Sequence, residues 1–122
     1  MNIPQMKLLA KHLPLYKEGH CACLQDLKGG FSIQGVMCDL YRRAKKGGAW
    51  VENPVKGSQG LRFLVESGPW CIDAPEEVVS WYGMTPQENT HLWELHASGY
   101  TFEQIARAIE KALEKRVVGI GI

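Results

Sequence analysis

The sequence has no long apolar run and no large excess of charge of either sign. Its net charge is +1 at pH 7, so the overall charge does not favour a polyanion as partner. No apolar run approaches the ~20 residues that cross a bilayer. The first residues contain scattered lysines and a proline, without the apolar core or cleavage site of a secretory signal. We therefore expect a cytoplasmic protein without a membrane partner.

The chain also lacks internal repeats, low-complexity linkers and a phosphate-binding glycine loop. Its 122 residues suit one compact domain, so we expect residues 1–122 to fold as a single domain. The segment KGSQG lacks the Gly-Lys-Ser/Thr ending of a phosphate loop, and no two carboxylates have a spacing that forces them together. We expect no catalytic residues, cofactor or bound metal. A small hydrolase or a nucleotide-binding protein is the third alternative, after the two functions described below.

The four cysteines, Cys21, Cys23, Cys38 and Cys71, do not have the paired tight-turn spacing of a zinc knuckle or ribbon. Unpaired cysteine is among the most buried residue types, and a reducing compartment keeps it as the thiol. We predict four thiols that pack in the protein. A zinc site that also uses His20 is the alternative.

Helical patterns occupy most of the chain. Apolar residues recur at the spacing of one helix face from 33 to 44, after Ser32 as a candidate N-cap. Two candidate capping boxes follow, Thr85 with Glu88 and Thr101 with Gln104. These signals predict helices near 4–13, 32–46, 75–82, 86–98 and 102–115.

Two short strands flank the turn-rich segment ENPVKGSQG, one at Trp50 and Val51 and the other over 61–65. A hairpin of this size is marginal alone, so it must pack against the helices. The predicted fold class is α+β, a helix-rich single domain of about five helices with one small β-hairpin. For the tail, residues 116–122, a last strand and a frayed end are both open.

Cys38 and Asp39 stand side by side inside the helix predicted near 32–46. Cys38 lies about two turns into that helix and borders its apolar face. The helix dipole lowers a thiol pKa mainly within the first turn, so its effect on Cys38 is weak. Asp39 lies on the polar flank, three and four residues before Arg42 and Arg43. We predict a packed thiol and a solvated ion pair at these two positions.

Four tryptophans are many for this length. Tryptophan is favoured both in cores and at the centres of interfaces, and those next to turns are the candidates for contact with a partner. Trp81 and Trp93 are expected in the core. The predicted partner-binding residues are Trp50, Arg62, Trp70 and Tyr82.

Nucleic-acid binding has two signals. The segment RRAKK places four positive charges on about one and a half helical turns, and HLWELHASGYTFEQIARAIE has the order helix, glycine-containing turn, helix. The second of these helices has a mixed and partly acidic surface, which is unfavourable for phosphates. A helix-turn-helix-like DNA-binding regulator is therefore the alternative function, with the candidate residues Arg42, Arg43, Lys45, Lys46, Gln104 and Arg107.

Three segments, SIQGVMCDLY (32–41), PEEVVSWYG (75–83) and LWELHASGYTFEQIARAIE (92–110), occur in this order. Together they resemble the motifs of a family of small, largely uncharacterised bacteriophage and bacterial proteins. In that family the corresponding stretches are of the type Cys-Cys-Leu-Gly-Val-Leu-Cys-Asp-Leu-Tyr, Pro-x-x-Val-x-x-Trp-x-Gly and Leu-x-x-Leu-Asn-Asp-x-Gly-x-Ser-Phe-x-Glu-Ile-Ala-x-x-Ile-Glu. The resemblance extends over most of the chain, from about Lys7 to Leu113.

The departures from the family pattern bear on chemistry. Ser32 and Ile33 stand where the family often has paired cysteines, and His96 and Ala97 stand where it often has Asn-Asp. The resemblance implies a phage context but no activity, and phage proteins of this size often act by binding a host protein. We therefore expect a non-enzymatic accessory protein that binds a host or phage protein partner, in host takeover or anti-defence. A homodimer is a further expectation, and so is the host cytoplasm as the location if a phage encodes the protein.

Overall fold

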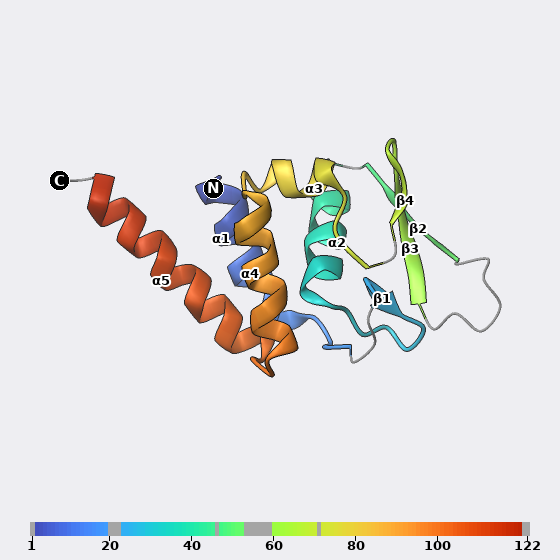
Figure 1. Cartoon of the computed structure of the whole chain (residues 1–122), viewed down its shortest axis with the longest axis horizontal. Coiled ribbons are helices and arrows are strands. Elements are labelled where there is room, and N and C mark those ends of the chain that lie inside the picture. The colour runs from blue at the N-terminus through green and yellow to red at the C-terminus, as the bar shows by residue number, and fades with distance from the viewer. Residues whose placement is uncertain (1, 20–22, 46, 53–59, 71, 121–122) are drawn as a thin grey trace.

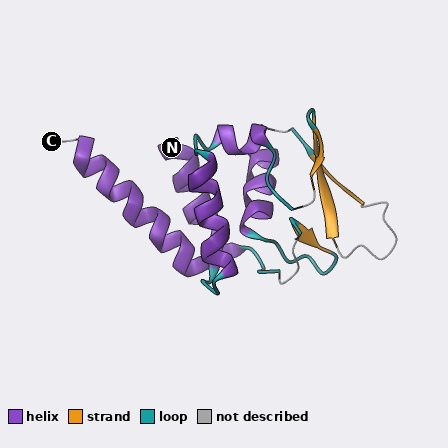
Figure 2. Ribbon diagram, in the orientation of Figure 1, coloured by secondary structure: helices purple, strands orange, loops and turns teal. Residues whose placement is uncertain are grey.

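The computed structural model describes residues 2–19, 23–45, 47–52, 60–70 and 72–120, with the backbone alone for Lys45 and for residues 116–120. Its helices gather on one side and its strands on the other (Figure 2). The described residues form five α-helices and a small antiparallel sheet of four strands. This arrangement confirms the predicted α+β fold class.

The first helix, α1, spans Ile3–His12 and continues into a short 3-10 turn, η1, at Leu13–Leu15. Pro4 lies in the first turn of α1, where its missing N–H interrupts no helical hydrogen bond. The α-helix ends before Pro14, as predicted, because a proline ring clashes with the carbonyl group one turn earlier. One face of this segment is buried through Met6, Leu9, Ala10 and Leu13.

The second helix, α2, spans Ile33–Lys45 and lies between the other helices and the sheet (Figure 1). Ser32 caps it, because the Ser32 hydroxyl oxygen accepts a hydrogen bond from the Gly35 amide at 3.1 Å. Every residue from 33 to 40 is buried, so the first two turns have no solvated face. The prediction that Asp39 lies on a polar flank is therefore wrong, because α2 is covered on all sides there.

The predicted hairpin is present as β2, Ala49–Glu52, paired with β3, Gly60–Val65. Two further strands, which the sequence pattern does not predict, pair with β3: the two-residue β1, Gln25–Asp26, and β4, Gly68–Trp70. All pairings are antiparallel. The two new strands pair with the same part of β3 as β2 does. Strands β1 and β4 must therefore lie along the edge of β3 that is opposite to β2.

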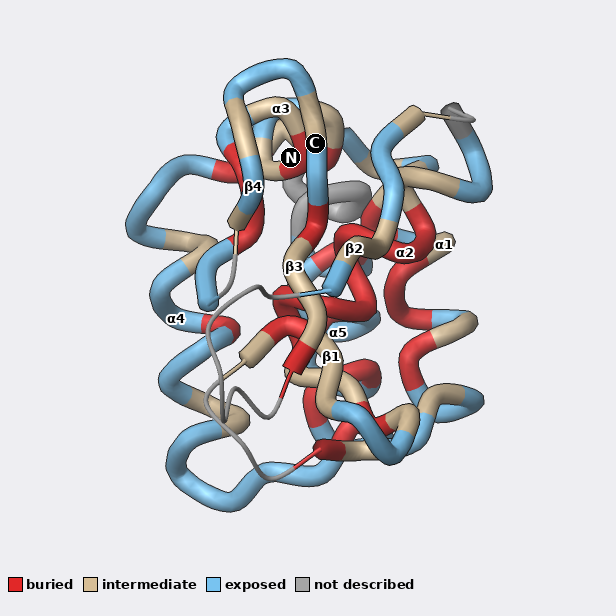
Figure 3. The backbone as a smooth tube through the Cα atoms, turned by 90° about the vertical axis from the view of Figure 1, so that its right-hand side faces the viewer, coloured by how far each residue is buried: buried red, intermediate tan, exposed pale blue. Residues whose placement is uncertain are grey.

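A row of aromatic side chains crosses the sheet on the face that meets the helices. Phe63 pairs with Trp50 on one side and with Trp70 on the other, and directly paired residues point to the same face. Phe63 is fully buried, and its ring centroid lies 4.9 Å from that of Trp50. This row therefore packs the sheet onto α2. In Figure 3 the backbone of the buried residues lies inside the molecule and that of the exposed residues lies at the periphery.

Three helices complete the fold: α3, Glu76–Trp81, α4, Pro86–Ala97, and α5, Phe102–Ile120. Both predicted capping boxes are confirmed, because each threonine hydroxyl accepts from the amide three residues later and the later side chain accepts from the threonine amide.

The long helix α5 packs against α1 and then projects beyond the other helices (Figure 1). It continues to Ile120, so the expectation of a strand or a frayed end for the tail is wrong as far as that residue. Residues 121 and 122 lie outside the described part. Among the helices of the described residues, none combines the length and the apolar character needed to cross a membrane.

The two tryptophans expected in the core, Trp81 and Trp93, differ in how far they are buried. Trp81 is partly buried and packs against the hydrophobic core, as predicted. Its ring centroid lies 5.7 Å from that of Tyr41. Trp93 is 46% exposed, so its assignment to the core is wrong. It belongs to α4, in which Leu92 alone is buried, because this helix contacts the rest of the fold along a narrow stripe.

Gly35 generates a testable prediction, because a Cβ at this position would overlap the backbone carbonyl group of Leu24. In an open helix, replacing glycine with alanine stabilises by about 1 kcal/mol. Here we expect Gly35→Ala to lower the free energy of unfolding by about 1–3 kcal/mol, measured by urea denaturation. Gly47→Ala is the matched control, since no atom of the described residues lies within 4 Å of its Cβ position, and it should change stability by less than about 0.5 kcal/mol. A stabilised Gly35→Ala protein would contradict the close approach of α2 to Leu24.

Candidate binding cleft

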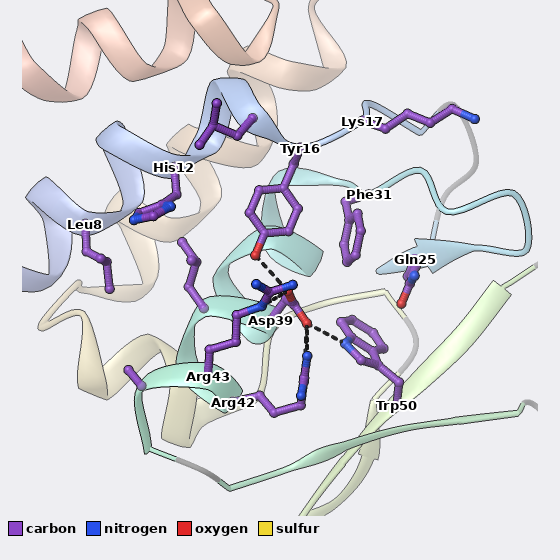
Figure 4. Close-up of a pocket in the computed structure, with 13 residues that line it drawn as sticks. Leu8, His12, Tyr16, Lys17, Gln25, Phe31, Asp39, Arg42, Arg43 and Trp50 are labelled. Atoms are coloured by element: carbon purple, nitrogen blue, oxygen red, sulfur yellow. Dashed lines mark hydrogen bonds and ion pairs between the residues drawn. The ribbon is translucent and has the colours of Figure 1, made fainter.

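A cleft of about 700 Å³ opens where α1, η1 and α2 meet the sheet (Figure 4). Its walls come from segments far apart in the sequence. They comprise Leu8 and His12 of α1, Leu15 of η1, Tyr16 and Lys17 of the segment after η1, Gln25 of β1, Phe31 of the segment before α2, Asp39, Leu40, Arg42, Arg43 and Ala44 of α2, and Trp50 of β2.

The Asp39 carboxylate lies at the centre of this cleft and is only 3% exposed. Its Oδ1 atom accepts from Arg42 Nη2 at 2.9 Å and from Trp50 Nε1 at 3.0 Å. Its Oδ2 atom accepts from the Tyr16 hydroxyl at 2.7 Å and from Arg43 Nε at 3.0 Å. These four side chains converge on one carboxylate (Figure 4), and we call the five residues the Asp39 network.

The hydrogen bonds decide which groups carry charge. Burial would raise the pKa of Asp39, but the hydrogen bonds from Tyr16, Trp50 and Arg42, together with the Arg42 charge, outweigh it and lower that pKa. Burial, followed by the hydrogen bond to Asp39 and its charge, raises the pKa of Tyr16. The carboxylate is therefore held as the anion and the phenol as a neutral donor.

The network also fixes the aromatic wall of the cleft. The ring centroids of Tyr16 and Phe31 lie 5.0 Å apart, and those of Phe31 and Trp50 lie 5.9 Å apart, both with edge-to-face geometry. Trp50 continues this chain of rings to the buried Phe63. The cleft is therefore formed by packed side chains held by hydrogen bonds.

Asp39 thus differs from its sequence prediction, which gives a solvated ion pair. The pairing with Arg42 and Arg43 is confirmed, but the carboxylate is buried and the two arginines cover it. A buried carboxylate without partners is strongly unfavourable, and the four donors remove most of that penalty.

Its neighbour Cys38 is a free thiol with no exposed surface, as predicted. Burial, and then the Asp39 charge, raises the pKa of Cys38, which is the opposite of what a cysteine nucleophile needs. Two adjacent residues therefore have separate roles, because consecutive side chains of a helix point about 100° apart.

The prediction of four thiols is wrong, because Cys23 forms a disulfide bond. His20, Cys21 and Cys71 lie outside the described residues. Within the described part of the chain, no three histidine, cysteine or acidic side chains come together as a metal site would require.

The predicted partner-binding residues do not form one surface. Trp50 lines the cleft, and Trp70 donates its indole N–H to Ser67 Oγ at 3.0 Å. Arg62 precedes Phe63 in β3 and so points to the opposite face of the sheet. Tyr82 is fully buried and donates to the Met37 carbonyl oxygen at 3.1 Å, so its prediction as a partner contact is wrong.

The predicted DNA-binding residues are also separated. Arg42 and Arg43 line the cleft, whereas the Gln104 side chain accepts the Thr101 amide in its capping box. Arg107 pairs with Glu103 on the exposed side of α5, at 2.7 Å. The Lys45 side chain and Lys46 lie outside the described part. The structure therefore brings two of the six candidates together, at the cleft.

Sequence reasoning missed Tyr16, Lys17 and Phe31 as members of a site. They lie in a segment without helix or strand periodicity, so no local pattern marks them. The one usable signal is Asp39 itself, a carboxylate surrounded in sequence by the apolar residues of a buried helix.

Comparisons of the chain with family models, with curated proteins and with solved structures give no match in any of the three. The resemblance of its three segments to the phage family therefore stays a prediction.

The lowered pKa of Asp39 generates a prediction for acid stability. Its carboxylate contributes stability above the unfolded pKa of about 4, and this contribution is lost as the pH falls through the lower folded pKa. We expect Asp39→Asn to lower the free energy of unfolding at neutral pH by on the order of 2 kcal/mol and to lose less further stability below about pH 4. Urea unfolding across this pH range measures both effects. The exposed Asp73→Asn is the control, and equal acid dependence of wild type and Asp39→Asn would contradict the network.

Cys38 provides a second prediction. Because alkylation needs an accessible thiolate, iodoacetamide should leave Cys38 unmodified in the folded protein and modify it in concentrated urea. Peptide mapping by mass spectrometry reports this cysteine separately from the other three. Rapid modification of Cys38 in the folded state would show that this helix is not packed as described.

Proposed function

We propose that the protein is a non-enzymatic accessory protein of the phage type that binds a host or phage protein partner through the cleft at the Asp39 network. The observation that carries the proposal is the set of side chains gathered there. Tyrosine, tryptophan and arginine are the residue types enriched at the centres of protein interfaces, and the cleft holds Tyr16, Trp50, Arg42 and Arg43 together.

The form of the cleft supports a partner of protein size. Leu15 lies at its wall with 77% of its surface exposed, and it provides apolar contact area beside the polar network. Hydrogen bonds and ring packing hold Tyr16, Arg42 and Trp50 before any partner arrives. Such preorganisation lowers the entropy cost of association.

The titration of the central groups argues for binding rather than proton transfer. An acid-base catalyst works best with a pKa near the working pH. The pKa of Asp39 is lowered and that of Tyr16 is raised, so both move away from neutrality. The four donors on Asp39 also occupy the lone pairs with which it would accept a proton.

The DNA-binding alternative receives less support. A helix-turn-helix protein presents side chains of its second helix to the bases. Of the two candidates in α5, Gln104 already accepts a hydrogen bond from the Thr101 amide, and Arg107 already donates to Glu103. The DNA-binding alternative stays a prediction.

The cytoplasmic location also stays a prediction. Four free thiols would have been consistent with a reducing compartment, but Cys23 forms a disulfide bond.

The test compares two matched double variants in affinity capture from host lysate. Leu15→Gln with Arg43→Gln changes one exposed leucine and one exposed arginine of the cleft. Leu27→Gln with Arg107→Gln makes the same changes outside it. We expect the cleft variant to weaken binding of the captured partner at least about tenfold, and the control variant to change it less than about twofold.

Affinities of the identified partner, measured by calorimetry, decide the outcome. Equal affinity of both variants would place the partner elsewhere on the protein. Turnover of a small molecule by the purified protein in an unbiased metabolite screen would contradict the non-enzymatic part of the proposal.

A further inference from the structure

The charges in the cleft do not balance. Its described lining carries three permanent cations, Lys17, Arg42 and Arg43, against the single carboxylate of Asp39. Asp39 is the anion for both arginines, so one guanidinium charge is left without compensation inside the network. Lys17 adds a further charge nearby, where its ammonium donates only to the Lys28 carbonyl oxygen among the described residues. The cleft therefore attracts an anionic group.

Arg43 is placed to bind that group. It uses its Nε on Asp39 at 3.0 Å, and no described residue accepts a hydrogen bond from its two Nη groups. The side chain is 66% exposed, so these donors are accessible. A guanidinium donates best to a carboxylate or a phosphate, in pairs of parallel hydrogen bonds, and the bond to Asp39 limits the rotation of Arg43 before the anion binds.

The surroundings of Arg43 favour a carboxylate on a protein over the phosphates of a nucleic acid. Leu15 and Leu8 line the same cleft, so the anion must be accompanied by apolar groups. Phe31 packs edge to face against Tyr16 and Trp50. Since these rings contact one another, they do not offer the separate ring faces on which nucleic-acid bases stack.

We propose that the cleft binds an acidic segment of its protein partner, in which an aspartate or glutamate carboxylate meets Arg43 and an adjacent apolar side chain contacts Leu15. This inference rests on the proposed function and names the chemistry that the cleft recognises. The carboxylate accepts from the Nη groups of Arg43 while Asp39 keeps the Nε, so both anions share one guanidinium.

The experiment uses the full chain labelled with ¹⁵N and two peptides of equal length. The probe is acetyl-Leu-Glu-Glu-Leu-Glu-amide, and its uncharged counterpart has glutamine in place of each glutamate. Binding is followed by NMR through the indole N–H of Trp50, which donates to Asp39 inside the cleft. We expect the acidic peptide to shift this resonance and to bind at least about tenfold more tightly than the glutamine peptide.

Variants locate the effect. Arg43→Gln should weaken the acidic peptide at least about fivefold, and Arg43→Lys should weaken it less, because it keeps the charge and loses the paired donors. Arg107→Gln is the matched control, since Arg107 is an equally exposed arginine that pairs with one carboxylate outside the cleft, and it should leave the affinity unchanged. The amide spectrum of each variant confirms that it is folded.

Three results would overturn the inference: equal affinity for the two peptides, an affinity that does not respond to Arg43→Gln, or tighter binding of a single-stranded oligothymidylate at the same resonance. If the captured partner still depends on the cleft in the paired-variant test, the proposed function survives such a result and only the acidic chemistry is wrong. If neither the peptides nor a partner responds to changes in the cleft, both proposals fail.

Discussion

The buried carboxylate of Asp39 is the interaction on which the rest of the structure depends. An ionised group with so little exposed surface is tolerated only when it is paired and hydrogen-bonded. Its donors come from the segment after η1, from α2 and from β2. The need to satisfy one charge therefore fixes how the N-terminal helix, the central helix and the sheet meet, and the cleft forms at that junction.

The same network gives the cleft the properties on which the proposed binding depends. Holding one carboxylate with two arginines leaves one positive charge uncompensated in the network, and the Nη groups of Arg43 have no acceptor among the described residues. Its internal hydrogen bonds orient these donors in advance. A structural requirement of the fold thus supplies the groups to which we propose that an anion binds, and the excess charge links the stability of the protein to that proposed binding.

Two of the three segments on which the predicted family resemblance rests meet in the fold. In SIQGVMCDLY, Cys38 and Leu40 are buried, Asp39 holds the network, and Tyr41 packs its ring on Trp81 of PEEVVSWYG. Tyr82 of the second segment donates to the Met37 carbonyl oxygen of the first. These contacts give the two motifs a structural role, the joining of α2 to α3.

The sequence by itself determined the features that depend on residues close together along the chain. The two capping boxes, the start of α2 at Ser32 and the β2–β3 hairpin were all predictable, because caps, helical periodicity and turns are local. Only the tertiary structure decided the burial of Asp39, the exposure of Trp93 and the burial of Tyr82. Periodicity shows which residues share a face but not what covers that face. Tyr16 and Trp50 stand 23 and 11 positions from Asp39 in the sequence, and their contact with it exists only after the chain has folded.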